Sequence, residues 1–115
     1  MTAKKIEKLK DDIIKLLQKN GMWIDVYIYC NGKCWGTSDK EAKHFRYDGE
    51  PFVFEDDPHR VTEYAGDILT MTFEGPLYDA LNYGTGWEDL LQNLFGKYGL
   101  YFEFGNAWNL TAVEM

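Results

Sequence analysis

Residues 22–37, MWIDVYIYCNGKCWGT, decide the fold of this chain. Apolar and other residues alternate through Met22–Cys30, and many are β-branched or aromatic, which is typical of a β-strand. Asn31-Gly32 follows at once and favours a type I′ turn, because both central residues of that turn need a positive φ. The stretch therefore predicts a β-hairpin with a return strand over Lys33–Thr37.

An amphipathic helix is predicted before this hairpin. Its apolar residues recur at helical spacing: Ile6, Leu9, Ile13, Leu16 and Leu17. Thr2 is suited to cap the start of the helix, and Asn20-Gly21 supplies a left-handed residue at its end. Because the apolar stripe covers only one face, we expect the helix to pack that face on the sheet.

The middle of the chain predicts more β-structure. Asp48-Gly49 predicts a second hairpin that places Phe45 opposite Phe52, and Pro51 puts this hairpin at a sheet edge because proline has no N–H to donate. A capping box over Ser38–Glu41 predicts a short helical turn. Two further strands are expected over Val61–Ala65 and Ile68–Phe73.

The last forty residues predict two helices and a third hairpin. Proline after Gly75 favours the start of a short helix that ends near Gly84. A capping box over Thr85–Glu88 predicts a second helix, which ends at Gly99. Gly105-Asn106 then predicts the turn of a last hairpin.

These elements predict one α+β domain over residues 1–115. Its sheet is mainly antiparallel, built from hairpins, and packed by the N-terminal helix and one or two later short helices. No apolar run approaches the roughly 20 residues that span a bilayer, and the N-terminal residues are charged. We therefore expect no membrane contact and a cytoplasmic location.

The charge is unevenly distributed along the chain. Residues 1–20 carry six lysines and three acids, a net charge of +3, whereas residues 21–115 carry six Lys or Arg against sixteen Asp or Glu, a net charge of −10. This acidic body should repel nucleic acid and favour a basic protein partner. The alternative is that the charge only keeps the protein in solution.

The cysteines and histidines do not predict a metal site. Cys30 and Cys34 have C-x3-C spacing, whereas structural zinc sites use C-x2-C knuckles. On a hairpin that turns at Asn31-Gly32, the two sulfur atoms point to opposite faces, which also disfavours a disulfide. His44 and His59 have no predicted partner beside them. We expect two free thiols, no metal and no other cofactor.

No catalytic residue can be assigned from the sequence. Ser38 is the only serine, and it does not lie in a G-x-S-x-G motif. Gly84-Thr85-Gly86 precedes a helix as a phosphate loop does, but Glu88 and Asp89 would repel an anion there. An enzyme is therefore less expected than a non-enzymatic protein.

Aromatic residues are unusually frequent, at 17% of the chain. In the first strand Trp23, Tyr27 and Tyr29 alternate away from the apolar face, and in the last hairpin Trp108 and Leu110 would share the outer face. Such rings form either a binding surface or the floor beneath a covering helix. The candidate partner-binding residues combine these rings with the densest acidic cluster: Tyr27, Tyr29, Trp108, Glu55, Asp56 and Asp57.

Two functions fit these observations. The first is a non-enzymatic protein-binding or inhibitor module whose acidic, aromatic-bearing surface occupies a basic site on a partner; toxin-immunity proteins and nucleic-acid-mimicking inhibitors from phages or mobile elements are analogous in size and charge. The second is a small-molecule-binding domain or minor enzyme with an aromatic-lined pocket between sheet and helices. A homodimer joined through the aromatic face is compatible with both.

Overall fold

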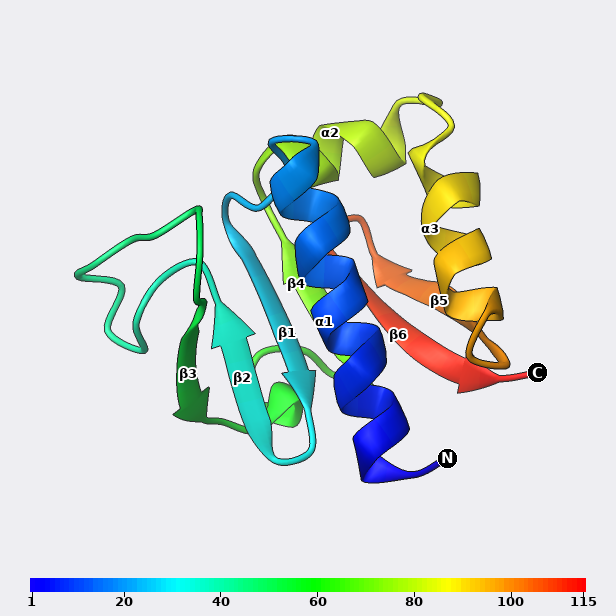
Figure 1. Cartoon of the computed structure of the whole chain (residues 1–115), viewed down its shortest axis with the longest axis horizontal. Coiled ribbons are helices and arrows are strands. Elements are labelled where there is room, and N and C mark those ends of the chain that lie inside the picture. The colour runs from blue at the N-terminus through cyan, green and yellow to red at the C-terminus, as the bar shows by residue number, and fades with distance from the viewer.

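The computed structural model describes residues 1–115 and confirms an α+β fold with an antiparallel sheet (Figure 1). The helices are α1 (Ala3–Lys19), α2 (Pro76–Asn82) and α3 (Trp87–Gly96), with a short 3-10 turn, η1, at Pro58–Arg60. The strands are β1 (Val26–Cys30), β2 (Lys33–Gly36), β3 (Phe52–Glu55), β4 (Thr70–Phe73), β5 (Leu100–Asn106) and β6 (Asn109–Glu114). They form one sheet in the order β3-β2-β1-β4-β6-β5. None of the helices is long and apolar enough to cross a membrane.

Helix α1 packs along one face of the sheet, as its apolar stripe predicts. The Thr2 hydroxyl accepts a hydrogen bond from the Lys5 N–H at 3.2 Å, and Gly21 takes the left-handed conformation that ends the helix. Leu9, Ile13 and Leu17 are fully buried against the sheet. Leu16 differs from the prediction, because it is only half-buried at the margin of the core.

The hairpin of β1 and β2 has the predicted turn and register. Asn31 and Gly32 have φ values of 52° and 76°, and Tyr29 pairs with Cys34. The predicted alternation fails before Val26, because Asp25 adopts a left-handed backbone with φ 55°. The strand starts only after this kink, at Val26, and Trp23 before it lies in the core, where only 1% of it is exposed. The prediction that Trp23 lies on the outer face is therefore wrong.

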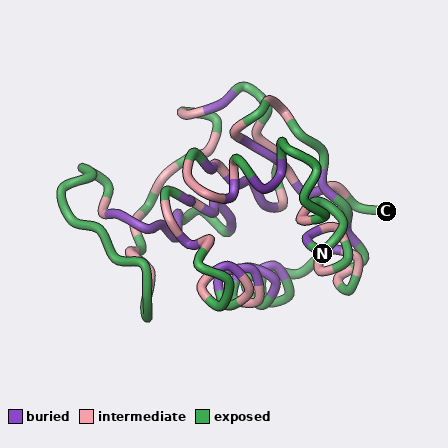
Figure 2. Tube along the Cα trace, turned by 90° about the horizontal axis from the view of Figure 1, so that it is seen from above, coloured by how far each residue is buried: buried purple, intermediate pink, exposed green.

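The predicted hairpin at Asp48-Gly49 does not form. Strand β3 pairs with β2, so that Phe52 lies opposite Gly36 rather than Phe45. The long β2–β3 loop, residues 37–51, is exposed along most of its length (Figure 2) and contains a single bridge between Ser38 and Phe45. Its many charged residues have low strand propensity, whereas β2 offers a free strand edge.

Two other predictions for this region differ in outcome. Strand β3 lies at a sheet edge, as Pro51 indicates. The helical turn over Ser38–Glu41 is absent: the Asp39 carboxylate accepts a hydrogen bond from the Lys43 N–H at 2.8 Å and closes an irregular turn instead.

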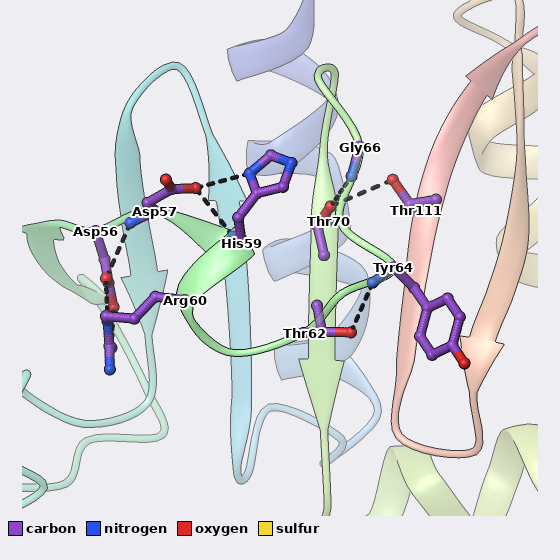
Figure 3. A network of polar contacts seen from close by, with 9 residues as sticks. All are labelled: Asp56, Asp57, His59, Arg60, Thr62, Tyr64, Gly66, Thr70 and Thr111. Carbon is purple, nitrogen blue, oxygen red and sulfur yellow. Dashed lines mark hydrogen bonds and ion pairs between the residues drawn. The ribbon is translucent and has the colours of Figure 1, made fainter.

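A crossover segment, residues 56–69, replaces the predicted strand over Val61–Ala65. It leaves the edge strand β3 and returns across the sheet to β4, on the face opposite α1 (Figure 3). Thr70 fixes its end, because its hydroxyl accepts from the Gly66 N–H at 3.0 Å and bonds the Thr111 hydroxyl at 3.2 Å. Gly66 is required at this contact, since a side chain there would collide with Thr111.

The C-terminal third forms with two adjustments. Helix α3 starts after Gly86, at φ 87°, and not after the predicted cap Thr85, whose hydroxyl accepts from the Trp87 N–H at 3.4 Å. The last hairpin turns at Ala107-Trp108 rather than Gly105-Asn106, because the Asn106 side chain accepts from the Trp108 N–H at 2.9 Å and closes the turn one step later. The register changes with it, and Leu110 faces the core, fully buried, instead of the outer face.

The core lies between the three helices and one face of the sheet. Its largest fully buried side chains include Trp23, Phe73, Phe95, Leu9, Ile13, Ile28 and Met71. The opposite face, called here the outer face, has no helix over it. It is crossed only by the crossover segment and flanked by the β2–β3 loop. The covering helix considered from the sequence is therefore absent.

Candidate functional site

The outer face contains a hollow of about 470 Å³ above β1 and β4. Its walls come from the β2–β3 loop, the crossover segment and the β5–β6 turn. It is lined by ten residues: Asp25, Tyr27, Tyr29, Ala42, Phe45, Val61, Thr72, Phe73, Glu74 and Trp108. We call it the outer-face hollow. Its volume falls within the roughly 300–1,000 Å³ that is usual for ligand pockets.

The pleat of β1 supplies the two tyrosines of the floor. Tyr27 and Tyr29 project from alternate positions onto the outer face, while Ile28 between them enters the core. The Tyr27 hydroxyl hydrogen-bonds the Ser38 hydroxyl, and its ring lies so close to Gly36 that any side chain at that position would overlap it. The floor is therefore held rigidly by the β1–β2 hairpin.

Trp108 forms the wall on the other side of the hollow. Its carbonyl accepts a hydrogen bond from the Phe73 N–H at 2.8 Å, which ties the β5–β6 turn to the end of β4. The side chain stays half-buried, and Val61 of the crossover segment also lines the hollow. Phe45, half exposed, contributes from the β2–β3 loop. Aromatic rings from three separate segments thus surround one space.

Tyr29 of the floor and Cys34 of β2 are buried neighbours on adjacent strands. Burial raises the pKa of the Tyr29 hydroxyl above its usual range, and the nearby Cys34 thiol adds to that rise. Burial likewise raises the pKa of Cys34 to about 12. Neither group is poised to ionise near neutral pH, so neither is an activated nucleophile or base.

The two thiols lie on opposite faces of the hairpin, as the sequence predicts. Cys30 belongs to the core and Cys34 to the outer face, and both are free and buried. Burial raises the pKa of Cys30 to about 12. No group of three or more His, Cys, Asp or Glu side chains is arranged to hold a metal ion.

Two carboxylates, Asp25 and Glu74, stand at one end of the outer-face hollow. Asp25 immediately precedes β1 and Glu74 immediately follows β4, where Val26 pairs with Phe73, and the Glu74 N–H donates to the Asp25 carbonyl at 3.1 Å. Gly75 packs tightly against this junction, because a Cβ there would lie 2.5 Å from the Ile24 carbonyl oxygen. Neither carboxylate has an ion-pair partner or a side-chain hydrogen bond, and no Lys, Arg or His lines the hollow.

Backbone strain is concentrated beside the same hollow. The chain has three non-glycine residues with positive φ, and one of them, Asn31, belongs to the hairpin turn. The other two, Asp25 and Ala42, both line the hollow. A left-handed alanine costs about 1–2 kcal/mol, so tertiary contacts must hold Ala42 in place. Such strain is often found at functional sites.

The predicted acidic cluster is largely engaged within the chain (Figure 3). The Asp56 carboxylate forms a two-pronged pair with Arg60, at 2.9 and 2.6 Å, and this guanidinium lowers the pKa of Asp56. Asp57 accepts from the backbone and ring of His59, which lowers its pKa as well. Only Glu55 keeps a carboxylate without such a partner, and it points to the helix side of β3, opposite Lys33.

No family model, curated protein or solved structure matches this chain.

The structure brings together half of the residues predicted for the site. Tyr27, Tyr29 and Trp108 line one hollow, although they are far apart in sequence. Asp56 lies in a smaller adjoining hollow of about 130 Å³, where Tyr27 and Tyr29 also contribute and where Lys40 and Arg60 supply positive charge. Glu55 and Asp57 line neither space.

The carboxylates of the site are not among the residues predicted from the sequence. Asp25 lies on the same alternation as Tyr27 and Tyr29, so a signal for it was present. Glu74 and Phe45 gave no such signal: Glu74 follows a strand end, and Phe45 was assigned to a hairpin that does not form. Their positions depend on strand order, which a hairpin pattern does not specify.

A second large hollow, of about 510 Å³, lies between α1 and the β2–β3 edge. This is the space between sheet and helix in which the alternative function placed an aromatic pocket. Trp35 is the only aromatic residue lining it, and Lys10 of the chain already covers that ring at 4.3 Å from its centroid. An aromatic-lined pocket is therefore found on the outer face and not between sheet and helices.

Proposed function

We propose that this chain is a non-enzymatic binding protein whose outer face holds a basic site of a partner protein. The observation that supports this most strongly is the outer-face hollow, where two carboxylates without partners adjoin four aromatic side chains that lie outside the core: Tyr27, Tyr29, Phe45 and Trp108. Tyr and Trp in such positions bury a large area at little cost in rotamer entropy. The net charge of −10 beyond residue 20 favours cationic partners.

The two kinds of residue have different tasks in this proposal. The carboxylates attract a basic partner and speed its encounter, an effect that weakens beyond roughly 8 Å at physiological ionic strength. The aromatic side chains keep the complex together and chiefly set its rate of dissociation. An inhibitor that occupies the basic, nucleic-acid-binding or toxic site of a cytoplasmic protein is the specific form that we propose.

The test starts from a peptide display selection against the immobilised protein, since it supplies ligands of known sequence. We expect peptides rich in Arg and Lys, whose association slows as salt rises. Trp108→Ala should speed their dissociation about tenfold or more, as expected for a contact worth more than about 1.4 kcal/mol. Tyr83→Ala removes an exposed aromatic that does not line the hollow and should change nothing.

The acidic contribution is tested separately. Asp25→Asn combined with Glu74→Gln should slow association and flatten its dependence on salt. Glu55→Gln with Asp57→Asn tests the acidic cluster that the sequence predicts as a binding site. Asp56 is left intact because its carboxylate pairs with Arg60. Selected peptides that lack positive charge, or that bind all variants equally, would contradict the proposal. A concentration-dependent dimer that loses the peptides would place a second copy on this face instead.

A small-molecule-binding protein is the second candidate, favoured by the volume and aromatic lining of the hollow. It differs from the first in its expected ligand. Thermal unfolding in the presence of a metabolite collection should then reveal a compound that raises the midpoint of the wild type and not of Trp108→Ala. Selected cationic peptides should in that case compete poorly with the compound.

A further inference from the structure

We propose that the outer-face hollow receives the side chain of a single arginine of the partner protein. This assignment rests on the proposed function and names the group that the hollow recognises.

The chain already contains one buried cation site of the required kind. The Lys10 ammonium lies 4.3 Å from the centroid of the Trp35 ring, 2.6 Å from an Asp11 oxygen and 3.9 Å from a Glu7 oxygen. Its side chain is only 6% exposed. One aromatic ring and two carboxylates are therefore enough to keep a cation largely out of water in this protein.

The outer-face hollow repeats these components without the cation. Tyr27 and Trp108 supply the rings, and Asp25 and Glu74 supply two carboxylates beside the adjoining ends of β1 and β4. The chain's own cation–π contacts, Lys10 on Trp35 and Arg46 on Phe52, lie elsewhere. Because neither carboxylate has a counter-charge within the chain, both would attract an incoming cation.

The charge of the adjoining space directs the cation to one end. The smaller hollow is lined by two bases, Lys40 and Arg60, and by two acids, Asp39 and Asp56, so its charges balance. A further cation would gain less there than beside carboxylates that have no partner. The Asp25–Glu74 end has no basic residue, so the position of the ligand charge is defined.

Arginine fits this site better than lysine. A guanidinium is planar, stacks on aromatic rings and can donate in parallel to two carboxylates, and it leaves water more readily than an ammonium does. The hollow offers four aromatic side chains and two carboxylates, which is more than the single ring that suffices for Lys10. Its volume also admits the longer, flat head group.

The test uses side-chain mimics and the full chain. Nα-acetyl-arginine methylamide is titrated into ¹⁵N-labelled protein and compared with the citrulline analogue, which has the same shape and no charge, and with the lysine analogue. The indole N–H signals are resolved reporters, because Trp108 lies in the hollow while Trp23, Trp35 and Trp87 lie outside it. Trp108→Phe identifies its signal.

We expect the arginine mimic to shift the Trp108 signal saturably, with a dissociation constant on the order of 1 mM, as suits one small ligand. The citrulline mimic should bind at least tenfold more weakly. Asp25→Asn with Glu74→Gln should weaken the arginine mimic by a similar factor. Asp79→Asn with Glu88→Gln removes two exposed acids of the helical layer and should leave binding unchanged.

Three results would overturn the assignment: equal binding of citrulline, tighter binding of lysine, or shifts that spread over all four indoles. These results are distinguishable from failure of the proposed function. Cationic peptides that bind through Trp108 while the arginine mimic does not would leave the function and remove the arginine. Saturable binding of the arginine mimic without any cationic peptide ligand would support the arginine site and contradict the proposed function.

Discussion

Gly75 lies where β4 leaves the sheet, and it has no room for a side chain. The Ile24 carbonyl oxygen lies 2.5 Å from the position of a Cβ there, and the Asp25 side chain lies 3.4 Å away. The contact brings the ends of β1 and β4 together and so sets the spacing of the two carboxylates. At the scale of single residues, the candidate site depends on this close approach as much as on its charged groups.

We expect Gly75→Ala to lower the free energy of unfolding by about 1–3 kcal/mol, because backbone must move to admit the methyl group. Gly96→Ala is the matched control: its Cβ would meet only the end of Met115 at 3.6 Å, at the last residue of α3. That change should be neutral or stabilising by up to about 1 kcal/mol. Urea unfolding of both variants measures the difference, and equal effects would contradict the role of Gly75.

Among the helices, strands and turns, the sequence correctly predicted those features that depend only on residues close together in the chain. The turn at Asn31-Gly32 and the burial of Leu9, Ile13 and Leu17 follow from local backbone preference and periodicity. The partner of β3 could not be predicted in this way, because any adjacent strand with a free edge satisfies its hydrogen bonds. The turn at Ala107-Trp108 was missed for a smaller reason, a single side-chain bond from Asn106.

Helix α1 provides an element-scale prediction. Leu17→Ala should cost about 2–5 kcal/mol of unfolding free energy, because Leu17 is fully buried. Leu16→Ala should cost clearly less, since Leu16 is only half-buried, and Lys15→Ala should stay within about 0.5 kcal/mol. Chemical unfolding followed by circular dichroism gives all three values. A Leu17 effect as small as that of Lys15 would mean that α1 is not part of the cooperative core.

At the scale of the whole molecule, one face of the sheet carries the core and the other carries the candidate site. The sequence predicted the α+β class and three of the residues that line the outer-face hollow, the aromatic residues Tyr27, Tyr29 and Trp108. It could not predict that two loops would enclose them, because Phe45 and Val61 enter the wall through strand order. It also could not show that Asp56 is neutralised by Arg60.

The ionisable groups predict a bounded range of pH stability. The pKa values of Asp39, Asp56 and Asp57 are lowered in the folded state by backbone N–H groups and by Arg60. Their contribution is present above the unfolded pKa near 4 and is lost as the pH falls further. Burial raises the pKa of Cys30 and Cys34 to about 12, so the unfolded thiols ionise first and stability falls above about pH 9.

We therefore expect the urea midpoint to be level between about pH 5 and 8 and to fall on both sides. Asp56→Asn should lower the midpoint at pH 7, because it breaks the pair with Arg60, and should make the acid limb shallower. Cys34→Ala should make the alkaline limb shallower and leave the acid limb unchanged. An acid limb that is identical in wild type and Asp56→Asn would contradict this assignment.

The hollow has a floor on β1 and β4 and walls that come mainly from two loops, which has a consequence for how this protein can change over generations. Most of the wall residues come from the β2–β3 loop and the crossover segment, which contribute little to the helix-covered core. Substitutions in these loops can alter which partner is recognised while the fold persists. The outer face can therefore evolve, whereas the helix-covered face must conserve the core. A lineage that must keep pace with a changing partner would vary at Phe45 and Val61 and retain Gly36 and Gly75.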